Sequence, residues 1–383
     1  MYVTLPAICS LLVLQASPLV QAASFPPPTG PYNVGYTQKV FNHTTPNDPV
    51  APKNASDTLL VTIYYPTLSI PTPNATAPYL DSVTAELWGS ALQFPSRSLE
   101  SLKTWNIIDA TPLKATDGGG KLPTVLLSPG GGVNSIMYNA LSSNLASNGY
   151  TVLAIDHPGE IPYLALPPNP VGLNGVYGLD ITYVWNQPLQ EAVFDYRVSD
   201  ALALVNGLYL AFVEEEKLSW NTTHYLMLGH SLGGAASAAA VSSAPEKILG
   251  GINLDGLFVD LPDVGNPFLM MAGQEHTLDL DATWGPFSQN QTGWWQWVNV
   301  TGSNHLDYSD LGDWVDLQGL RNQTLMPQVG PIWAPRMNYL VEEWVKGFFG
   351  FVLGETSWED LVDGAKLKWP EMVFVNGSSK SAR

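Results

Sequence analysis

The chain has almost no cysteine and little charge, and both shortages exclude classes of chemistry. Its one cysteine, Cys9, lies in an apolar N-terminal stretch, so a chain processed after this stretch has no thiol. Disulfides, cysteine nucleophiles and thiolate metal sites are then excluded. Charged residues make up only 13 % of the 383 residues, and the formal net charge is −18. Such an acidic chain disfavours nucleic acid and anionic membranes as partners.

The N-terminal stretch has the pattern of a secretory signal peptide. An apolar run from Ile8 to Val20 precedes the small residues Ala22 and Ala23, which suit cleavage by signal peptidase. The run is too short for a membrane span, so we expect residues 1–23 to be removed, with no stable membrane insertion. Asn-X-Ser/Thr sequons begin at Asn42, Asn54, Asn74, Asn221, Asn290, Asn299, Asn322 and Asn376. Their density predicts a secreted, extracellular glycoprotein.

Extended apolar segments alternate with helical ones from residue 121 onward. The segments that read as strands are TLLVTIYYP further upstream, then LPTVLLS, YTVLAID, HYLMLG, ILGGINLD, NPFLMMAG and WWQWVNV. Helices are expected over residues 135–148, 191–216 and 334–353. This alternation predicts an α/β fold with a mostly parallel central sheet and helices on both faces. Residues 24–31 read as an extended, mobile leader, and residues 24–383 as a single domain with an insertion at about 157–190.

One serine stands between two glycines in LMLGHSLGGAASAAA, where an apolar strand gives way to a helix. A sharp turn of this kind crowds its central residue, and Gly229 and Gly233 remove the side chains that would clash. The turn lifts Ser231 to the carboxyl edge of the sheet, beside a helix N-terminus. A glycine turn without chemistry is the alternative, but the position between strand and helix favours a nucleophile.

A serine nucleophile needs a base, and His305 is the favoured one. In sites of this kind the base follows the serine along the chain, which leaves His276 and His305 among the six histidines. His305 lies in GSNHLDY, just past the last predicted strand, where a loop can return the ring to the serine. His276 occupies a position that suits an acid better. We expect His230 to be structural and His43, inside a sequon, to be exposed.

The orienting acid stays open between two positions on these grounds. Asp255 follows the strand after the serine, and Glu275 and Asp279 follow the next strand. Acyl transfer also needs hydrogen-bond donors for the oxyanion. LLSPGGGVN ends a predicted strand with three glycines, so we expect the N–H groups of Gly131 and Leu232 to serve as donors.

The motifs resemble the α/β-hydrolases and, within them, the plasma-type platelet-activating factor acetylhydrolase family. The matching segments, in the family's order, are LPTVLLSPGGG, LASNGYTVLAIDHPGE, GHSLGG, GGINLDG and GSNHLDYSDL. The resemblance implies Ser231 as nucleophile, His305 as base and Asp255 as acid, which decides between the carboxylates. It also implies the oxyanion donors Gly131 and Leu232, and no metal or cofactor.

Two departures limit what the resemblance implies about the substrate. Pro129 stands where the family has a histidine, and the insertion is not a family signature. We therefore expect hydrolysis of short-acyl esters, from small molecules or lipids, rather than acetyl-phospholipid specificity. A tailoring hydrolase or cyclase of secondary metabolism with the same triad is the main alternative, and a non-catalytic binding module is another.

The insertion should set substrate size, because it would cover the pocket. Its prolines predict a preformed wall rather than a swinging lid. The large side chains expected to narrow the acyl side are Tyr163, Leu164, Leu166, Tyr177, Tyr183 and Trp185. Glu160 is expected to be a solvated loop carboxylate, with a place at the site as the alternative. No feature of the sequence sets the oligomeric state.

Overall fold

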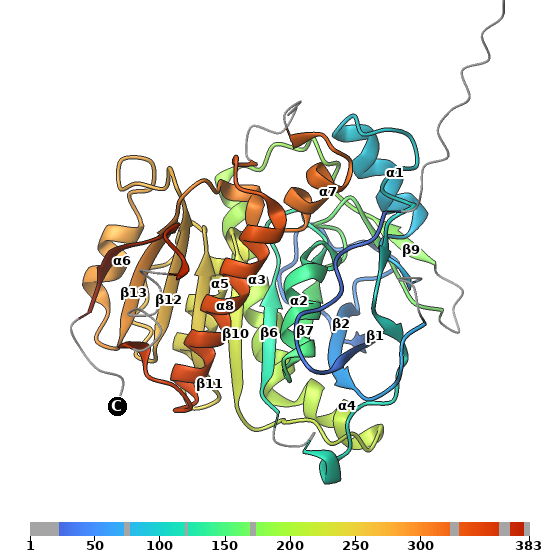
Figure 1. The fold of residues 1–383 in the computed structure, drawn as a ribbon, viewed down its shortest axis with the longest axis horizontal. Coiled ribbons are helices and arrows are strands. Elements are labelled where there is room, and N and C mark those ends of the chain that lie inside the picture. Colours follow the sequence, from blue (N-terminus) through green and yellow to red (C-terminus); the bar gives the residue numbers. More distant parts are fainter. Residues whose placement is uncertain are drawn as a thin grey trace, which may run out of the picture.

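A ten-stranded sheet lies at the centre of the structure, a computed structural model that describes residues 23–72, 77–118, 122–168, 174–321, 329–359 and 368–378 (Figure 1). In spatial order its strands are β14 (Met372–Gly377), β13 (Trp295–Val300), β12 (Phe268–Gly273), β11 (Ile248–Leu254), β10 (Tyr225–His230), β6 (Thr124–Ser128), β7 (Thr151–Asp156), β2 (Thr58–Thr67), β1 (Asn33–Asn42) and β5 (Ile107–Ile108). The predicted signal peptide lies outside the described residues except for Ala23.

The middle of the sheet is parallel and is flanked by antiparallel pairs, and the short edge strand β5 is parallel to β1. Strand β6 pairs in parallel with β7 and β10, and the parallel pairing continues through β11 and β12 to β13. Strand β2 runs antiparallel to β1 and β7, and β14 runs antiparallel to β13. Every residue of β6, β7, β10 and β12 is buried, because a parallel sheet is covered on both faces. The predicted α/β sheet is confirmed.

Helices cover both faces of this sheet. They are α2 (Asn139–Ser147), α3 (Gln187–Ala203), α4 (Tyr209–Glu215), α5 (Leu232–Ser243), α6 (Trp284–Asn290) and α8 (Ala334–Val352). Helices α1 (Ser82–Ala91) and α7 (Leu311–Leu317) pack against each other in a separate apolar cluster. Alternate residues of β6 face opposite layers. Val125 and Leu127 share an apolar cluster with α2 and α8, whereas Leu126 shares one with α3, α4, α5 and α6. Figure 1 shows α2 and α8 on the near side of the sheet.

Residues 24–31, expected to be mobile, pack against the body of the protein instead. Phe25 is only 3 % exposed, and its ring lies 4.6 Å from that of Tyr79, centroid to centroid. Its N–H donates to the carbonyl of Lys103 at 3.0 Å. Burial of this aromatic ring fixes the leader, which the proline-rich sequence alone does not indicate.

The helix expected over residues 191–216 begins earlier and is divided. Helix α3 begins at Gln187, capped by the side chain of Asn186. A π-helical turn, Leu204–Leu208, separates it from α4, and Gly207 within this turn has a non-helical backbone. In the described ranges, no helix combines the length and apolar character that crossing a membrane requires.

The insertion forms a small hairpin at the β2 side of the sheet. Its strands are β8 (Tyr163–Ala165) and β9 (Gly175–Tyr177), paired antiparallel. Leu164 and Val176 pack with Leu60 of β2. The hairpin is therefore anchored on β2, whereas Glu160 before it and Trp185 after it lie at the carboxyl ends of the central strands.

Candidate active site

Ser231 lies on the turn between β10 and α5 with a strained backbone. Its φ is 55° and its ψ −124°, a conformation that residues other than glycine seldom adopt. A Cβ on Gly229 would come within 2.0 Å of the Gly233 carbonyl oxygen, and a Cβ on Gly233 within 2.1 Å of the Ser128 oxygen. The two glycines are required because the helix backbone passes this close to the strand. The turn has the geometry of a nucleophile elbow.

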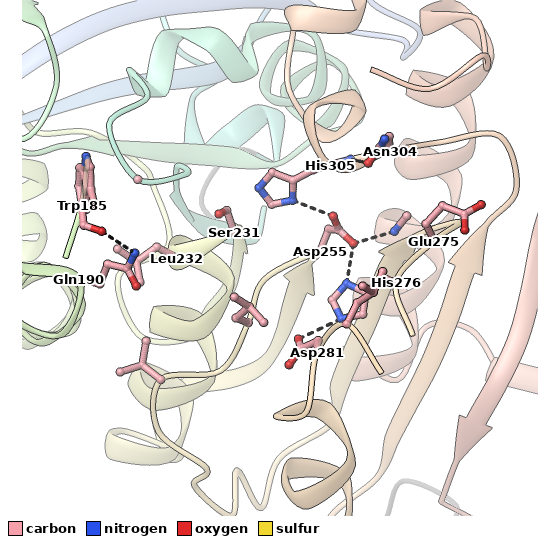
Figure 2. A pocket seen from close by; sticks show the side chains of 15 residues that line it. Trp185, Gln190, Ser231, Leu232, Asp255, Glu275, His276, Asp281, Asn304 and His305 are labelled. Carbon is pink, nitrogen blue, oxygen red and sulfur yellow. Dashed lines mark hydrogen bonds and ion pairs between the residues drawn. The ribbon is translucent and has the colours of Figure 1, made fainter. Parts of the chain in front are cut away.

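Asp255 and His305 are joined by a hydrogen bond beside this turn. Asp255 follows β11 directly, and His305 begins a short helical turn after β13. His305 Nδ1 donates to Asp255 Oδ2 at 2.7 Å, and the other carboxylate oxygen accepts from the Gly273 N–H at 2.7 Å. Figure 2 shows the imidazole between Asp255 and the Ser231 side chain. All three residues line one pocket.

Among the described residues, Ser231 Oγ and His305 are not joined by a hydrogen bond (Figure 2). The Asp255 contact leaves His305 Nε2 free to face the pocket, which Ser231 also lines. Loose contacts between nucleophile and base are usual in the absence of substrate and tighten on binding.

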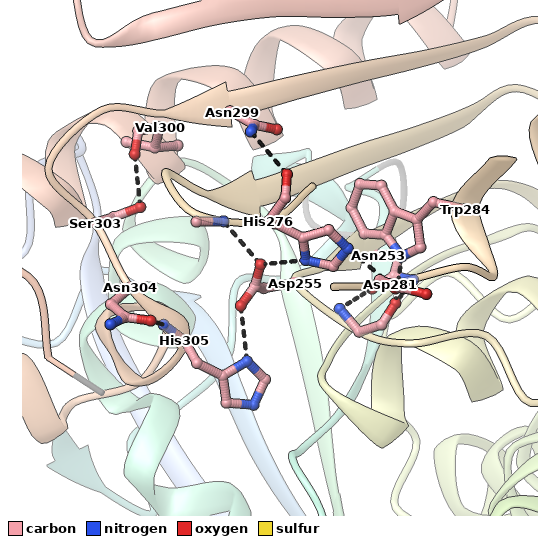
Figure 3. A network of polar contacts seen from close by, with 12 residues as sticks. Asn253, Asp255, His276, Asp281, Trp284, Asn299, Val300, Ser303, Asn304 and His305 are labelled. Atoms are coloured by element: carbon pink, nitrogen blue, oxygen red, sulfur yellow. Dashed lines mark hydrogen bonds and ion pairs between the residues drawn. The ribbon is translucent and has the colours of Figure 1, made fainter. Parts of the chain in front are cut away.

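A second histidine, His276, contacts the same carboxylate (Figure 3). Its Nδ1 lies 2.9 Å from Asp255 Oδ1, and its Nε2 lies 3.0 Å from Asp281 Oδ2. Burial opposes ionisation of Asp255, but the hydrogen bonds from His276 and His305 hold its pKa well below the ordinary value. Both ring nitrogens of His276 are engaged, so His276 is not placed to take a proton from Ser231.

The competing acid positions are occupied by exposed side chains. Glu275 lines the pocket, but its carboxylate accepts from the Gln274 side chain at 3.0 Å rather than from a histidine. Asp279 is exposed on the same loop. Asp281 lies on the same loop after β12, and the sequence patterns do not single it out. Its carboxylate contacts His276 rather than His305.

His230, next to the serine, forms a hydrogen bond with the backbone of His305. Its Nδ1 accepts from the Tyr138 hydroxyl at 2.7 Å, and its Nε2 donates to the backbone carbonyl of His305 at 2.9 Å. Burial lowers the pKa of His230 to about 3, and proximity to His305 adds to this effect. His230 is therefore neutral. The Tyr138 hydroxyl also accepts from the Gly130 N–H at 2.8 Å, so one chain of hydrogen bonds links the glycine loop to His305.

The remaining histidines lie away from the pocket, and one prediction for them is wrong. His43, expected to be exposed, is largely buried, with Nε2 2.9 Å from Asp200 Oδ1. His157 Nδ1 lies 2.8 Å from the other oxygen of Asp200. The buried Asp200 carboxylate contacts both rings, so His43 is not in solvent although it lies inside the sequon at Asn42.

A buried ion pair holds the glycine loop from behind. Arg197 of α3 and Glu160 are 2 % and 1 % exposed, so Glu160 is neither a solvated carboxylate nor part of the pocket lining. Arg197 Nε donates to Glu160 Oε2 at 3.0 Å, and its Nη2 donates to the Gly130 carbonyl at 3.0 Å. Its Nη1 also donates to the Pro129 carbonyl. Glu160 Oε1 in turn accepts from the Gly132 N–H at 3.0 Å.

This arrangement fixes the direction of the Gly131 N–H. The C=O and N–H of a trans peptide point in opposite directions. Because the Gly130 carbonyl points at Arg197, the N–H of Gly131 points away from Arg197. In the described residues, neither this N–H nor that of Leu232 has a hydrogen-bond acceptor. Both residues line the pocket with Ser231.

The pocket has a volume of about 480 Å³ and largely apolar walls. Its apolar side chains are Trp185, Leu232, Leu257, Val259 and Leu280. Of the six large side chains that sequence analysis places over the pocket, Trp185 alone lines it. Tyr163 and Leu164 are buried beside the sheet, and Tyr177 and Tyr183 face solvent. The wall comes instead from the loops after β11 and β12, because the hairpin is anchored at the other end of the sheet.

Most described sequons are exposed, with one clear exception. Asn42, Asn54, Asn290 and Asn376 are exposed, Asn221 is half-buried, and Asn74 and Asn322 lie outside the described residues. Both ends of the Asn299 amide are engaged. Its oxygen accepts from Trp297 Nε1 at 2.6 Å, and its nitrogen donates to the His276 carbonyl at 3.2 Å. A glycan on Asn299 would replace one hydrogen of this nitrogen, so only one N–H would remain for the His276 carbonyl.

Within the described ranges, no group of three or more His, Cys, Asp or Glu side chains is arranged to hold a metal ion. The contacts between His276, His305 and the two carboxylates are hydrogen bonds within ring–carboxylate pairs.

The sequence and the fold are similar to those of known hydrolases. The profile of the alpha/beta hydrolase fold family matches residues 123–296. The profile of platelet-activating factor acetylhydrolase, isoform II, matches residues 19–161. A ferulic acid esterase from Streptomyces cinnamoneus has a similar fold, with a TM-score of 0.75 and 24 % identity over 93 % of this chain and 100 % of its own. The chain has the α/β-hydrolase fold, and the predicted fold is confirmed.

Two relatives have names that describe a narrower activity. A probable 1-alkyl-2-acetylglycerophosphocholine esterase of Arthroderma benhamiae is 26 % identical over 409 residues, which cover 96 % of this chain and 98 % of the relative. A platelet-activating factor acetylhydrolase of Canis lupus familiaris is 27 % identical over 342 residues, 78 % of this chain and 71 % of the relative. Within the α/β-hydrolases, the chain resembles the platelet-activating factor acetylhydrolase family, as its motifs indicate.

Proposed function

We propose that the protein is a secreted serine carboxylic ester hydrolase that cleaves short-acyl esters through Ser231, His305 and Asp255. The observation that carries the proposal is the 2.7 Å hydrogen bond from His305 Nδ1 to Asp255 Oδ2, in a pocket that Ser231 also lines. An imidazole oriented by a carboxylate and free at Nε2 is what a serine nucleophile requires.

The reaction proceeds through an acyl-enzyme. Ser231 Oγ attacks the ester carbonyl carbon while His305 Nε2 accepts the hydroxyl proton. The oxyanion of the tetrahedral intermediate accepts hydrogen bonds from the N–H groups of Gly131 and Leu232. The C–O bond to the alcohol breaks, and the alcohol leaves with the proton from His305. Water then attacks the acyl group with His305 as base, which releases the acid and restores Ser231.

The proposed substrate is a short-acyl ester of a small-molecule or lipid alcohol. The fungal relative is named for an acetyl ester of a glycerophospholipid, which supports this class. The pocket, at about 480 Å³, has the size of a small-molecule site. Trp185 bounds it on the side of the glycine loop, and Leu257, Val259 and Leu280 provide apolar contact area.

Secretion is proposed from the N-terminal pattern and the sequons. Asn42, Asn54 and Asn376 are exposed and can carry glycans. Asn290 is exposed too, and its Nδ2 donates to the Leu261 carbonyl at 3.0 Å. We also propose that residues 24–383 form one domain, because ten strands, from β1 near the beginning of the chain to β14 near its end, belong to a single sheet.

Covalent labelling by a fluorophosphonate tests the proposal. We expect one labelled serine, Ser231, and loss of both labelling and ester hydrolysis in Ser231→Ala. Residual turnover should be about a thousandth of the wild-type rate or less. Ser242→Ala is the matched control, because Ser242 lies on the same helix but donates to the Asp263 carbonyl at 3.0 Å, outside the pocket.

Two results would contradict the proposal. Labelling at a serine other than Ser231 would refute the nucleophile. Release of the alcohol without free acid, with the acyl group passed to a second alcohol or amine, would refute hydrolysis and favour a tailoring transferase or cyclase. The native protein should also shift in mass on enzymatic deglycosylation, and a native protein without glycans would contradict secretion through this route.

A further inference from the structure

His276 is held between two carboxylates, one of which is the proposed catalytic acid. Nδ1 lies 2.9 Å from Asp255 Oδ1 and Nε2 lies 3.0 Å from Asp281 Oδ2. Ionised carboxylates only accept hydrogen bonds, so both ring nitrogens must donate for both contacts to form. That arrangement is an imidazolium. Figure 3 shows His276 and His305 on different oxygens of Asp255.

The surroundings keep this imidazolium in place. The ring is largely buried, lies 4.1 Å from the ring of Trp284, centroid to centroid, and is 10 % exposed at the side chain. Burial alone would lower the pKa of His276, but its bonds to Asp255 and Asp281 raise it to about 9. Asp281 is fixed in turn, because its Oδ1 accepts from the N–H and the hydroxyl of Thr283 at 2.7 and 2.5 Å.

We propose that His276 is a positioning residue that sets the acid limit of activity: a fixed cation on the far side of Asp255 that opposes protonation of His305. The inference rests on the proposed function, since it takes His305 as the base. Asp255 carries one negative charge and contacts two rings. The charge on His276 therefore reduces the stabilisation that Asp255 can give to a proton on His305.

The other groups around the base do not provide this effect. His230 packs against His305, with ring centroids 4.6 Å apart, but it is neutral because burial lowers its pKa to about 3. Tyr308 lies beyond His230, and burial raises its pKa far above the ordinary value, so it is neutral too. Glu275 lines the pocket but is exposed to solvent and screened. Asp281 is negatively charged and contacts Nε2 of His276, the ring nitrogen that does not face Asp255.

Two substitutions should move the acid limb of the kcat/KM profile in opposite directions. His276→Asn can keep a donor towards Asp255 while it removes the positive charge, so the proton on His305 becomes more favourable. Its acid limb should move to higher pH by about half a unit or more. Asp281→Asn removes a negative charge and leaves His276 cationic in the acid range. Its acid limb should move to lower pH.

Asp279→Asn is the matched control, because it makes the same charge change on the same loop, two residues from Asp281, but outside the pocket. Its profile should coincide with that of the wild type. Thermal unfolding and fluorophosphonate labelling of each variant at pH 8 check that the fold and Ser231 remain intact.

The outcomes distinguish the role of His276 from the proposed function. Opposite shifts support the proposal. Shifts in the same direction, or a loss of kcat without any shift in the acid limb, would overturn it and leave His276 with a packing role only. If Ser231→Ala keeps full activity, the proposed function itself fails, whatever the His276 variants do.

Discussion

Arg197 donates a hydrogen bond to the carbonyl of Gly130 at 3.0 Å, on the face of the glycine loop turned away from the pocket. The same guanidinium contacts the Pro129 carbonyl and Glu160, whose carboxylate accepts from the Gly132 N–H at 3.0 Å. Burial opposes the charge on Glu160, yet Arg197 holds the pKa of this carboxyl below its ordinary value. The loop that would supply an oxyanion donor is thus held by a charged pair inside the protein.

Replacing Arg197 by lysine should impair turnover more than binding. A lysine keeps the charge, but a single ammonium cannot reproduce the planar fork that contacts two carbonyls and a carboxylate. We expect kcat to fall tenfold or more, towards the about 10² to 10³ that loss of one oxyanion donor costs. KM should change little. Steady-state kinetics with an acetyl ester measures both.

Stability has to be measured in the same variant, because breaking a buried pair can cost about 3–5 kcal/mol. Urea unfolding gives that cost. If Arg197→Lys unfolds at lower urea but keeps the wild-type kcat at a temperature where it is folded, the pair stabilises the loop without orienting a donor.

Asp255→Asn should reduce kcat by orders of magnitude. The asparagine can present an N–H where His305 now finds an acceptor, which favours the wrong tautomer of the base. Glu275→Gln should have a much smaller effect, since Glu275 is exposed and bonded to Gln274. Parallel kinetics of the two variants decides the matter. A larger loss in Glu275→Gln than in Asp255→Asn would show that the acid is assigned to the wrong strand.

The sequence predicts the sheet and the serine turn well because both depend on local patterns. Fully buried strands are recognisable as short apolar runs, and the two glycines of the elbow are required by backbone contacts at the turn itself. The fold class follows from the alternation of such strands with helices. The strands at the two edges of the sheet, β5 and β14, carry weak sequence patterns, because they depend on pairing with distant parts of the chain.

The groups that support the site could not be predicted, because they come from distant elements. Arg197 meets Glu160 from a helix 37 positions further along the chain, and Asp281 reaches His276 across a loop. One signal was available. In a chain with 16 Lys and Arg residues, an arginine beside Val193, Phe194 and Tyr196 stands within the apolar pattern of its helix, and a buried arginine needs a carboxylate partner.

The protein should be most stable near pH 4 and lose stability towards pH 9. Burial raises the pKa of Asp156 from 3.8 to about 6, and it raises that of Asp307 equally. Such a carboxyl favours the folded state while protonated, so stability falls as the pH rises from about 4 through 6. The bonds of His276 stabilise fully below its ordinary pKa of 6.5, and this contribution is lost as the pH rises through about 9.

Thermal unfolding between pH 4.5 and 9 measures this dependence. Asp156→Asn removes one of the titrating carboxyls and should flatten the curve between pH 4.5 and 6.5. Asp255 affects stability at lower pH only. Because its pKa is depressed, it stabilises the fold above about pH 4, and this contribution is lost as the pH falls below that value. A midpoint that is constant, or that rises from pH 5 to pH 9, would mean that these carboxyls are better solvated than their burial indicates.

Trp185 should set the upper limit of acyl length. Its indole covers the glycine loop, where a Cβ on Gly131 would lie 3.6 Å from the ring. We expect kcat/KM of the wild type to fall from C2–C4 esters to C8 and longer ones, without a rate jump at a lipid–water interface. Each buried methylene gains only about 0.8 kcal/mol, which cannot offset a clash with a fixed indole.

Trp185→Ala should therefore raise the C8-to-C2 ratio of kcat/KM by about tenfold, the equivalent of about 1.4 kcal/mol or two methylenes. Tyr183→Ala is the control, because Tyr183 belongs to the same segment but is 46 % exposed and does not line the pocket. Its ratio should stay at the wild-type value. If the wild type already prefers long acyl chains and accelerates above their solubility limit, then the exposed leucines Leu257 and Leu280 at the pocket admit such chains, and Trp185 does not limit them.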